Sequence, residues 1–113
     1  MTSFSNAPWS SPESDLSADD YCSVCLIDEN AKGAAKVKDK CKLPVRSKPG
    51  APVNLNAVHA AAGAHGVQGV SAPAEAKRHA AGTLINYYDD AGEDAPDSLY
   101  RIAGKKPPAS KGS

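Results

Sequence analysis

The block from residue 41 to residue 88 constrains the fold more than any other part of this chain. It reads CKLPVRSKPGAPVNLNAVHAAAGAHGVQGVSAPAEAKRHAAGTLINYY, which predicts an extended LPVR segment, a Pro/Gly turn and two helices separated by glycines. The flanking sequence is charged or rich in Pro and Ser. We therefore expect a small, mainly α-helical domain over residues 17–91, with its core in 41–91. Long irregular arms, 1–16 and 92–113, would flank it.

A short helix is expected ahead of this block. Ser17 and Asp20 have the spacing of a capping box, which predicts a helix over residues 18–26. A mobile charged loop would follow over residues 28–40. In the LPVR segment, Pro44 cannot donate a hydrogen bond to a sheet, so this segment is expected to be extended or an edge strand.

Two longer helices are expected within the block. Asn54 or Asn56 can cap the first, which would end near residue 64 before a glycine-rich break. The second would begin at residue 71 or 72, with Pro73 in its first turn, and would end over residues 89–92. The predicted core consists of nine side chains: Leu43, Val45, Val53, Leu55, Val58, Leu84, Ile85, Tyr87 and Tyr88.

The apolar content is small, because alanine supplies much of it and the chain has one Met, one Phe and one Trp. A core of this size is only marginally stable by itself. The formal net charge is zero, but the charges are arranged in blocks of alternating sign. Such blocks favour docking on a partner or a second copy of complementary charge, although they are equally consistent with ordinary solvated faces.

Cys22, Cys25 and Cys41 are the residues to test for metal or disulfide chemistry. Their odd number is more typical of a reducing interior than of a disulfide framework. Together with His59 or His65 they could form a zinc site, but the second half of a zinc knuckle is missing. Packing of small thiols in a helix is the simpler interpretation, so no metal and no other cofactor is predicted.

The sequence gives no indication of catalysis. His59, His65 and His79 have no accompanying carboxylate pair, nucleophile elbow or phosphate-binding loop, so we predict that the chain is not an enzyme. The basic run over residues 32–48 lacks the interleaved aromatic residues of a nucleic-acid reader. No segment approaches the ~20 apolar residues of a membrane span, and the polar N-terminus does not resemble a secretory signal.

Several strings in the chain resemble a small domain encoded in the head gene clusters of tailed bacteriophages, especially those of actinobacteria. The matching strings are Trp9, CLID at 25–28, LPVR at 43–46, NLNAVHAAA at 54–62 and the helix that ends in LINYY at 84–88. The resemblance therefore covers residues 9–91. Leu55 replaces the basic residue expected between the two asparagines, and Cys22 and Cys41 are not part of the pattern.

The resemblance implies a structural protein of the virion, assembled in the host cytoplasm. Such a capsid decoration or minor capsid protein would bind the outside of the head. Its partners would be the major capsid protein and neighbouring copies of itself. The alternatives are a protease-associated assembly factor or a small nucleic-acid-binding or zinc-binding regulator. The arms and the basic segment supply the candidate partner-binding residues: Phe4, Trp9, Arg46, Lys48, Leu99, Tyr100 and Ile102.

Overall fold

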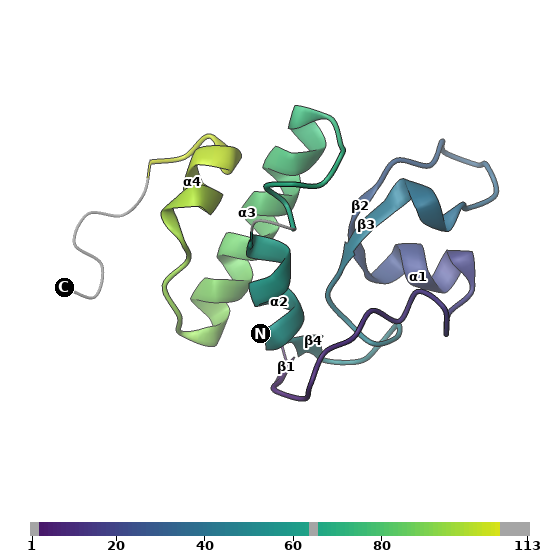
Figure 1. The fold of residues 1–113 in the computed structure, drawn as a ribbon, viewed down its shortest axis with the longest axis horizontal. Helices are drawn as coiled ribbons and strands as arrows, with labels where there is room; N and C mark the ends of the chain where they lie inside the picture. The colour runs from purple at the N-terminus through teal and green to yellow at the C-terminus, as the bar shows by residue number, and fades with distance from the viewer. Residues whose placement is uncertain (1–2, 64–65, 107–113) are drawn as a thin grey trace.

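The computed structural model describes residues 3–63 and 66–106. Over these residues the chain forms four α-helices, one short 3-10 helix and two sheets of two strands each. Helices α2, α3 and α4 lie together at one end of the molecule, and α1, β2 and β3 lie at the other end (Figure 1). The coarse expectation of a small helical domain is confirmed, but two small sheets accompany the helices.

The first helix, α1 (Ala18–Val24), begins as the capping box predicts, because the Ser17 side chain accepts a hydrogen bond from the Asp20 backbone N–H at 3.2 Å. The helix ends two residues earlier than expected. Cys25 leaves it to begin strand β2 (Cys25–Asp28), which pairs antiparallel with β3 (Cys41–Pro44). Pairing with the LPVR segment thus replaces the last predicted turn of the helix.

The charged segment between β2 and β3 has a defined path. It ends in the 3-10 helix η1 (Lys38–Lys40), and Asn30 ties its two ends together. The Asn30 side-chain oxygen accepts from the Val37 backbone N–H at 2.9 Å, and its amide nitrogen donates to Asp28 Oδ1 at 2.8 Å. Most of the segment is a loop, as predicted, but the Asn30 hydrogen bonds and η1 give it local structure that the sequence did not predict.

The N-terminal segment lies against the body of the molecule. Strand β1 (Phe4–Ser5) pairs in parallel with β4 (Val53–Asn54), as the path at the lower edge of Figure 1 shows. Asn54 also caps α2 (Leu55–Ala62): its side-chain oxygen accepts from the Ala57 N–H at 3.0 Å. Of the two asparagines that could cap this helix, the structure therefore uses Asn54.

The longest helix, α3 (Ala74–Ala91), begins just after Pro73, which is its N-cap rather than a residue of its first turn. It ends at Gly92, as predicted, where φ of 75° requires the left-handed conformation that glycine adopts without strain. The expected irregular C-terminal arm contains a further helix, α4 (Asp97–Ala103), packed against α3. That part of the fold prediction is wrong.

One main core lies between the helices and the sheet residues beside them. Six of the nine predicted core side chains are buried, whereas Leu43, Leu55 and Tyr87 are half-buried. Val67, in the glycine-rich break, is fully buried although it was not predicted. Its backbone N–H bonds to the Ala61 carbonyl at 2.6 Å, which carries the chain back over the end of α2.

Candidate functional site

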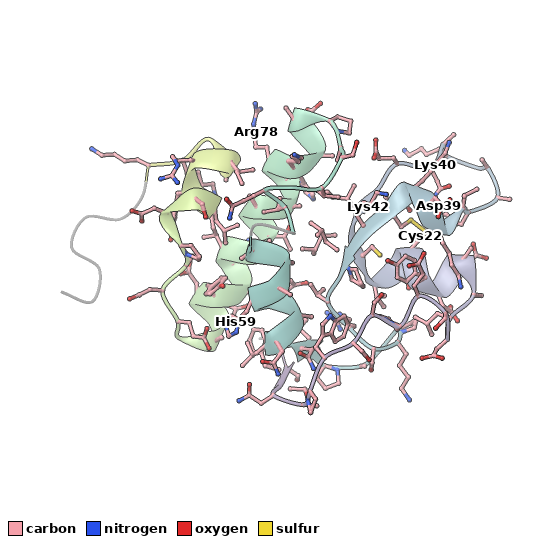
Figure 2. All side chains as sticks on the ribbon, in the orientation of Figure 1. Cys22, Asp39, Lys40, Lys42, His59 and Arg78 are labelled. Atoms are coloured by element: carbon pink, nitrogen blue, oxygen red, sulfur yellow. A yellow bond between two sulfur atoms is a disulfide. The ribbon has the colours of Figure 1, made fainter. Side chains whose placement is uncertain are left out.

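A disulfide joins the two ends of the N-terminal part of the fold. Cys22 in α1 and Cys41 at the start of β3 are bonded, with an S–S distance of 2.07 Å, and both are buried (Figure 2). The odd number of cysteines pointed away from a disulfide, and that inference is wrong for this pair. The register explains the pairing, because β3 brings Cys41 back beside the helix that carries Cys22.

Three polar side chains surround this disulfide. Asn30 Nδ2 lies 3.3 Å from the sulfur of Cys41 and 3.6 Å from that of Cys22. Asp28 accepts from Asn30 and forms an ion pair with Lys36 at 2.5 Å. Burial opposes ionisation of Asp28, but the hydrogen bonds from Lys36 and Asn30 outweigh it and lower the pKa of this carboxyl.

Cys25, the third cysteine, is free and half-buried. Burial raises the pKa of its thiol to about 12, and the nearby Asp28 and Glu13 charges add to the shift, against a hydrogen bond with Tyr21. The pKa of Tyr21 is raised as well, chiefly by burial. A thiol held in its neutral form is a poor nucleophile, so Cys25 has the environment of a structural residue.

The sequence predicted no metal, and its three candidate ligands Cys22, Cys25 and Cys41 are not the set that the fold gathers. Among the described residues, the group whose ligand atoms could share one ion consists of Cys22, Cys41 and Asp28. Asp28 takes the place of Cys25 because it is the register partner of Cys41 across the sheet. One sequence signal could have suggested this cluster. Asp28 lies two residues before Asn30, and Cys22 and Cys41 lie on either side of the pair in the sequence.

A cleft of about 490 Å³ separates β3 from α2. Its apolar wall includes Trp9, Leu43 and Val70, and Lys42 lies at the polar side. Figure 2 shows Lys42 on the edge of the sheet that faces the helices. Within the described residues no ion pair holds the Lys42 ammonium group. The cleft is also lined by Lys38, Glu13 and Asp39, so its polar side carries charges of both signs.

The backbone is strained at the wall of this cleft. Leu43 has φ of 64°, and it is the one residue other than glycine with positive φ in the described part of the chain. A bulky side chain rarely adopts this conformation, and such strain concentrates at binding sites. The cleft is therefore the candidate surface for a partner.

The two N-terminal candidates for partner binding are both half-buried against the main core. Phe4 makes an edge-to-face contact with Tyr87, with ring centroids 6.3 Å apart. Trp9 packs at the margin of the core and lines the cleft. Only Trp9 thus combines a fixed position with a place at the candidate surface.

The two basic candidates differ in how they are held. The Arg46 guanidinium donates to the Ala51 carbonyl at 2.8 Å and closes the turn between β3 and β4. Lys48 is exposed at that turn, away from the cleft residues. Arg46 therefore has a structural role in this conformation, which the sequence did not predict.

The three C-terminal candidates lie in α4. Leu99 is fully buried, Tyr100 is 7% exposed and Ile102 is half-buried against the core. These side chains hold α4 on α3, so the structure does not present Leu99 or Tyr100 to a partner.

The two histidines that the structure describes lie in different helices, His59 in α2 and His79 in α3. His59 Nε2 lies 2.7 Å from Glu93 Oε1, and its ring contacts that of Tyr88. Burial and the charge of Glu93 raise the pKa of Tyr88. His79 is exposed on α3, and His65 lies outside the described residues.

Comparison of the chain with protein-family models, with curated proteins and with solved structures gives no significant match. Among the described residues, no helix combines the length and the apolar content that a membrane span requires.

Proposed function

We propose that this chain is a viral structural protein, a capsid decoration or minor capsid protein that binds the outside of a bacteriophage head. In this proposal it stabilises contacts between capsid subunits and between its own neighbouring copies. The observation that carries the proposal is the presence of the LPVR and NLNAVHAAA strings at residues 43–46 and 54–62, which resemble those of phage head domains.

Most residues of these two strings are buried or half-buried. Val45 and Val58, one from each string, are buried together with Val53, which lies between the strings, and the Asn54 N–H donates to the Val45 carbonyl at 2.8 Å. The buried residues of the strings therefore form a scaffold. The contact surface has to lie among less buried residues, and Leu43, Pro44 and Ala60 of the same strings line the cleft beside β3. The cleft beside β3 is the best candidate, because it offers Trp9 and Leu43 as apolar contacts and Lys42 as a cation.

The partner proposed for this cleft is a segment of the major capsid protein that carries a carboxylate next to an apolar side chain. A carboxylate would meet Lys42, and the apolar side chain would lie against Trp9. Aromatic anchors of this kind supply much of the binding energy of interfaces. Repetition over a symmetric shell would then strengthen each modest contact through effective concentration.

Quantitative mass spectrometry of purified virions tests the function. High copy number, in fixed ratio to the major capsid protein, is the expected result. If virions from cells that make the chain lack it, the proposal is wrong.

Charge reversal tests the cleft. We expect Lys42→Glu to lower the copy number on virions, and Lys48→Glu to serve as a matched control, since Lys48 is exposed outside the cleft. Equal loss with both variants would place the docking surface elsewhere.

A further inference from the structure

The ligand atoms of Cys22, Cys41 and Asp28 all lie within 4.8 Å of one another. They come from three elements: α1, β3 and β2 respectively. Each element has its own backbone support, since Ser17 caps α1 and the two strands pair with each other. The three groups are therefore expected to stay together when the disulfide is reduced.

We propose that the reduced chain binds a zinc-class divalent cation through Cys22, Cys41 and Asp28. Two thiolates and one carboxylate are typical ligands of zinc, and water would complete a tetrahedral set. Cys25 is outside the set, because its thiol faces Tyr21 and does not belong to the group of converging ligand atoms. The inference is independent of the proposed virion role.

The surroundings of the three ligands suit a bound cation. Two thiolates and a carboxylate carry three negative charges, so a divalent ion leaves one, and the Lys36 ammonium beside Asp28 offsets it. Lys36 contacts Asp28 Oδ2, while Oδ1 is the oxygen that accepts from Asn30. In the disulfide form, Asn30 Nδ2 lies 2.8 Å from Asp28 Oδ1 and 3.3 and 3.6 Å from the two sulfurs, so it contacts all three candidate ligands at once. This amide would have to turn aside for an ion to bind, and it could then donate to a thiolate from outside the ligand set.

The disulfide and the metal site exclude each other, because the same two sulfurs form both. A dithiol reductant transfers two electrons to the Cys22–Cys41 bond, becomes a cyclic disulfide and leaves two thiols on the protein. Zinc then displaces one proton from each thiol as the Zn–S bonds form. Reducing cell interiors would favour the metal form, and oxidising surroundings would favour the disulfide.

Metal titration of the full chain tests this inference. The protein is reduced with dithiothreitol, freed of it by gel filtration without oxygen, and titrated with zinc sulfate against a chromophoric chelator. We expect one zinc ion per chain in the reduced protein and none at the site in the oxidised protein. Cobalt(II) in place of zinc should give the absorption bands of a thiolate complex.

Substitutions identify the ligands. Asp28→Asn should weaken zinc binding by about tenfold or more, since even second-shell changes cost 10–100-fold. Cys41→Ser should abolish the binding, with circular dichroism as a check that the helices persist. Asp39→Asn and Cys25→Ser are the matched controls, and neither should change the affinity.

Three results would overturn the inference. They are absence of zinc binding by the reduced protein, equal binding by the oxidised protein, and unchanged affinity in Asp28→Asn. The oxidised wild-type protein has its native fold, so that comparison holds even if Cys41→Ser fails to fold.

Discussion

The two ends of the molecule are held together by different means. The helical end, α2 to α4, contributes most of a buried cluster of 16 residues, with Leu84 and Leu99 at full burial. The stapled end, α1 with β2 and β3, has a separate cluster of only three buried residues: Tyr21, Cys22 and Cys41. A covalent bond and the Asn30 hydrogen bonds fix the end where apolar side chains are scarce.

The difference shows how a small chain can extend its fold beyond its core. Of the strand residues at the stapled end, Ile27 enters the main cluster and joins the two ends. The cleft lies where they meet, between β3 and α2. The shape of the cleft should therefore depend both on the apolar core of the helical end and on the disulfide and hydrogen bonds of the stapled end. Substitutions at each end test this difference.

The largest effect is expected at the helical end. Leu99→Ala should lower the free energy of unfolding by about 2–5 kcal/mol, because it leaves a cavity under α4. Urea denaturation followed by circular dichroism measures it, with the half-buried Ile102→Ala as a control of smaller effect. A change no larger than that of a surface substitution would mean that α4 is not part of the core.

Removal of the Cys22–Cys41 disulfide should have the next largest effect. The bond joins residues 19 apart, and replacing Cys22 and Cys41 by Ser should cost about 3 kcal/mol. In this double variant, we expect amide hydrogen exchange to accelerate more over residues 29–40 than over α3, relative to the wild-type protein. Equal acceleration at both ends would show that the two ends unfold as one unit. Cys25→Ser controls for loss of a thiol.

Loss of the α2 cap should have a moderate effect at the junction of the two ends. Asn54→Ala removes the hydrogen bond to the Ala57 N–H and also the bond from Asn54 Nδ2 to the Ala7 carbonyl. We expect a loss of about 1–2 kcal/mol in a thermal melt. Asn56→Ala, which removes bonds to the N-terminal segment only, should cost less. A larger cost at Asn56 would contradict the assignment of the cap.

Alkaline pH should weaken the stapled end. The pKa of Cys25 is raised to about 12 in the folded chain, whereas an unfolded thiol ionises near pH ~8.5. The contribution of this thiol to stability is therefore complete below the unfolded pKa and is lost as pH rises above it. The free energy of unfolding measured by denaturation should be lower at pH 10 than at pH 8, and Cys25→Ser should make this difference smaller. An identical decrease in that variant would contradict the assignment.

The smallest effect is expected at the Asp28–Lys36 ion pair, which is partly exposed. The lowered pKa of Asp28 means that its contribution is present above the unfolded pKa and is lost as pH falls through the folded pKa. Lys36→Met should cost less than about 1 kcal/mol at neutral pH. A larger loss of unfolding free energy would mean that this ion pair contributes more to the stability of the stapled end than a partly exposed pair usually does.

Local signals in the sequence predicted the ends of several elements. Ser17 and Asp20 marked the start of α1, Asn54 was one of two caps considered for α2, and Gly92 marked the end of α3. Each of these signals acts through hydrogen bonds or backbone freedom within a few residues, so the amino-acid order alone carries it.

The sequence alone therefore determined a small helical domain and several of its caps, and it drew attention to the cysteines. Tertiary structure decided the pairing of Cys22 with Cys41, the convergence of Asp28 on them and the burial of Leu99 in α4. It also decided the positive φ of Leu43 at the cleft. These features depend on segments brought together by strand register and helix packing, and no local pattern encodes such contacts.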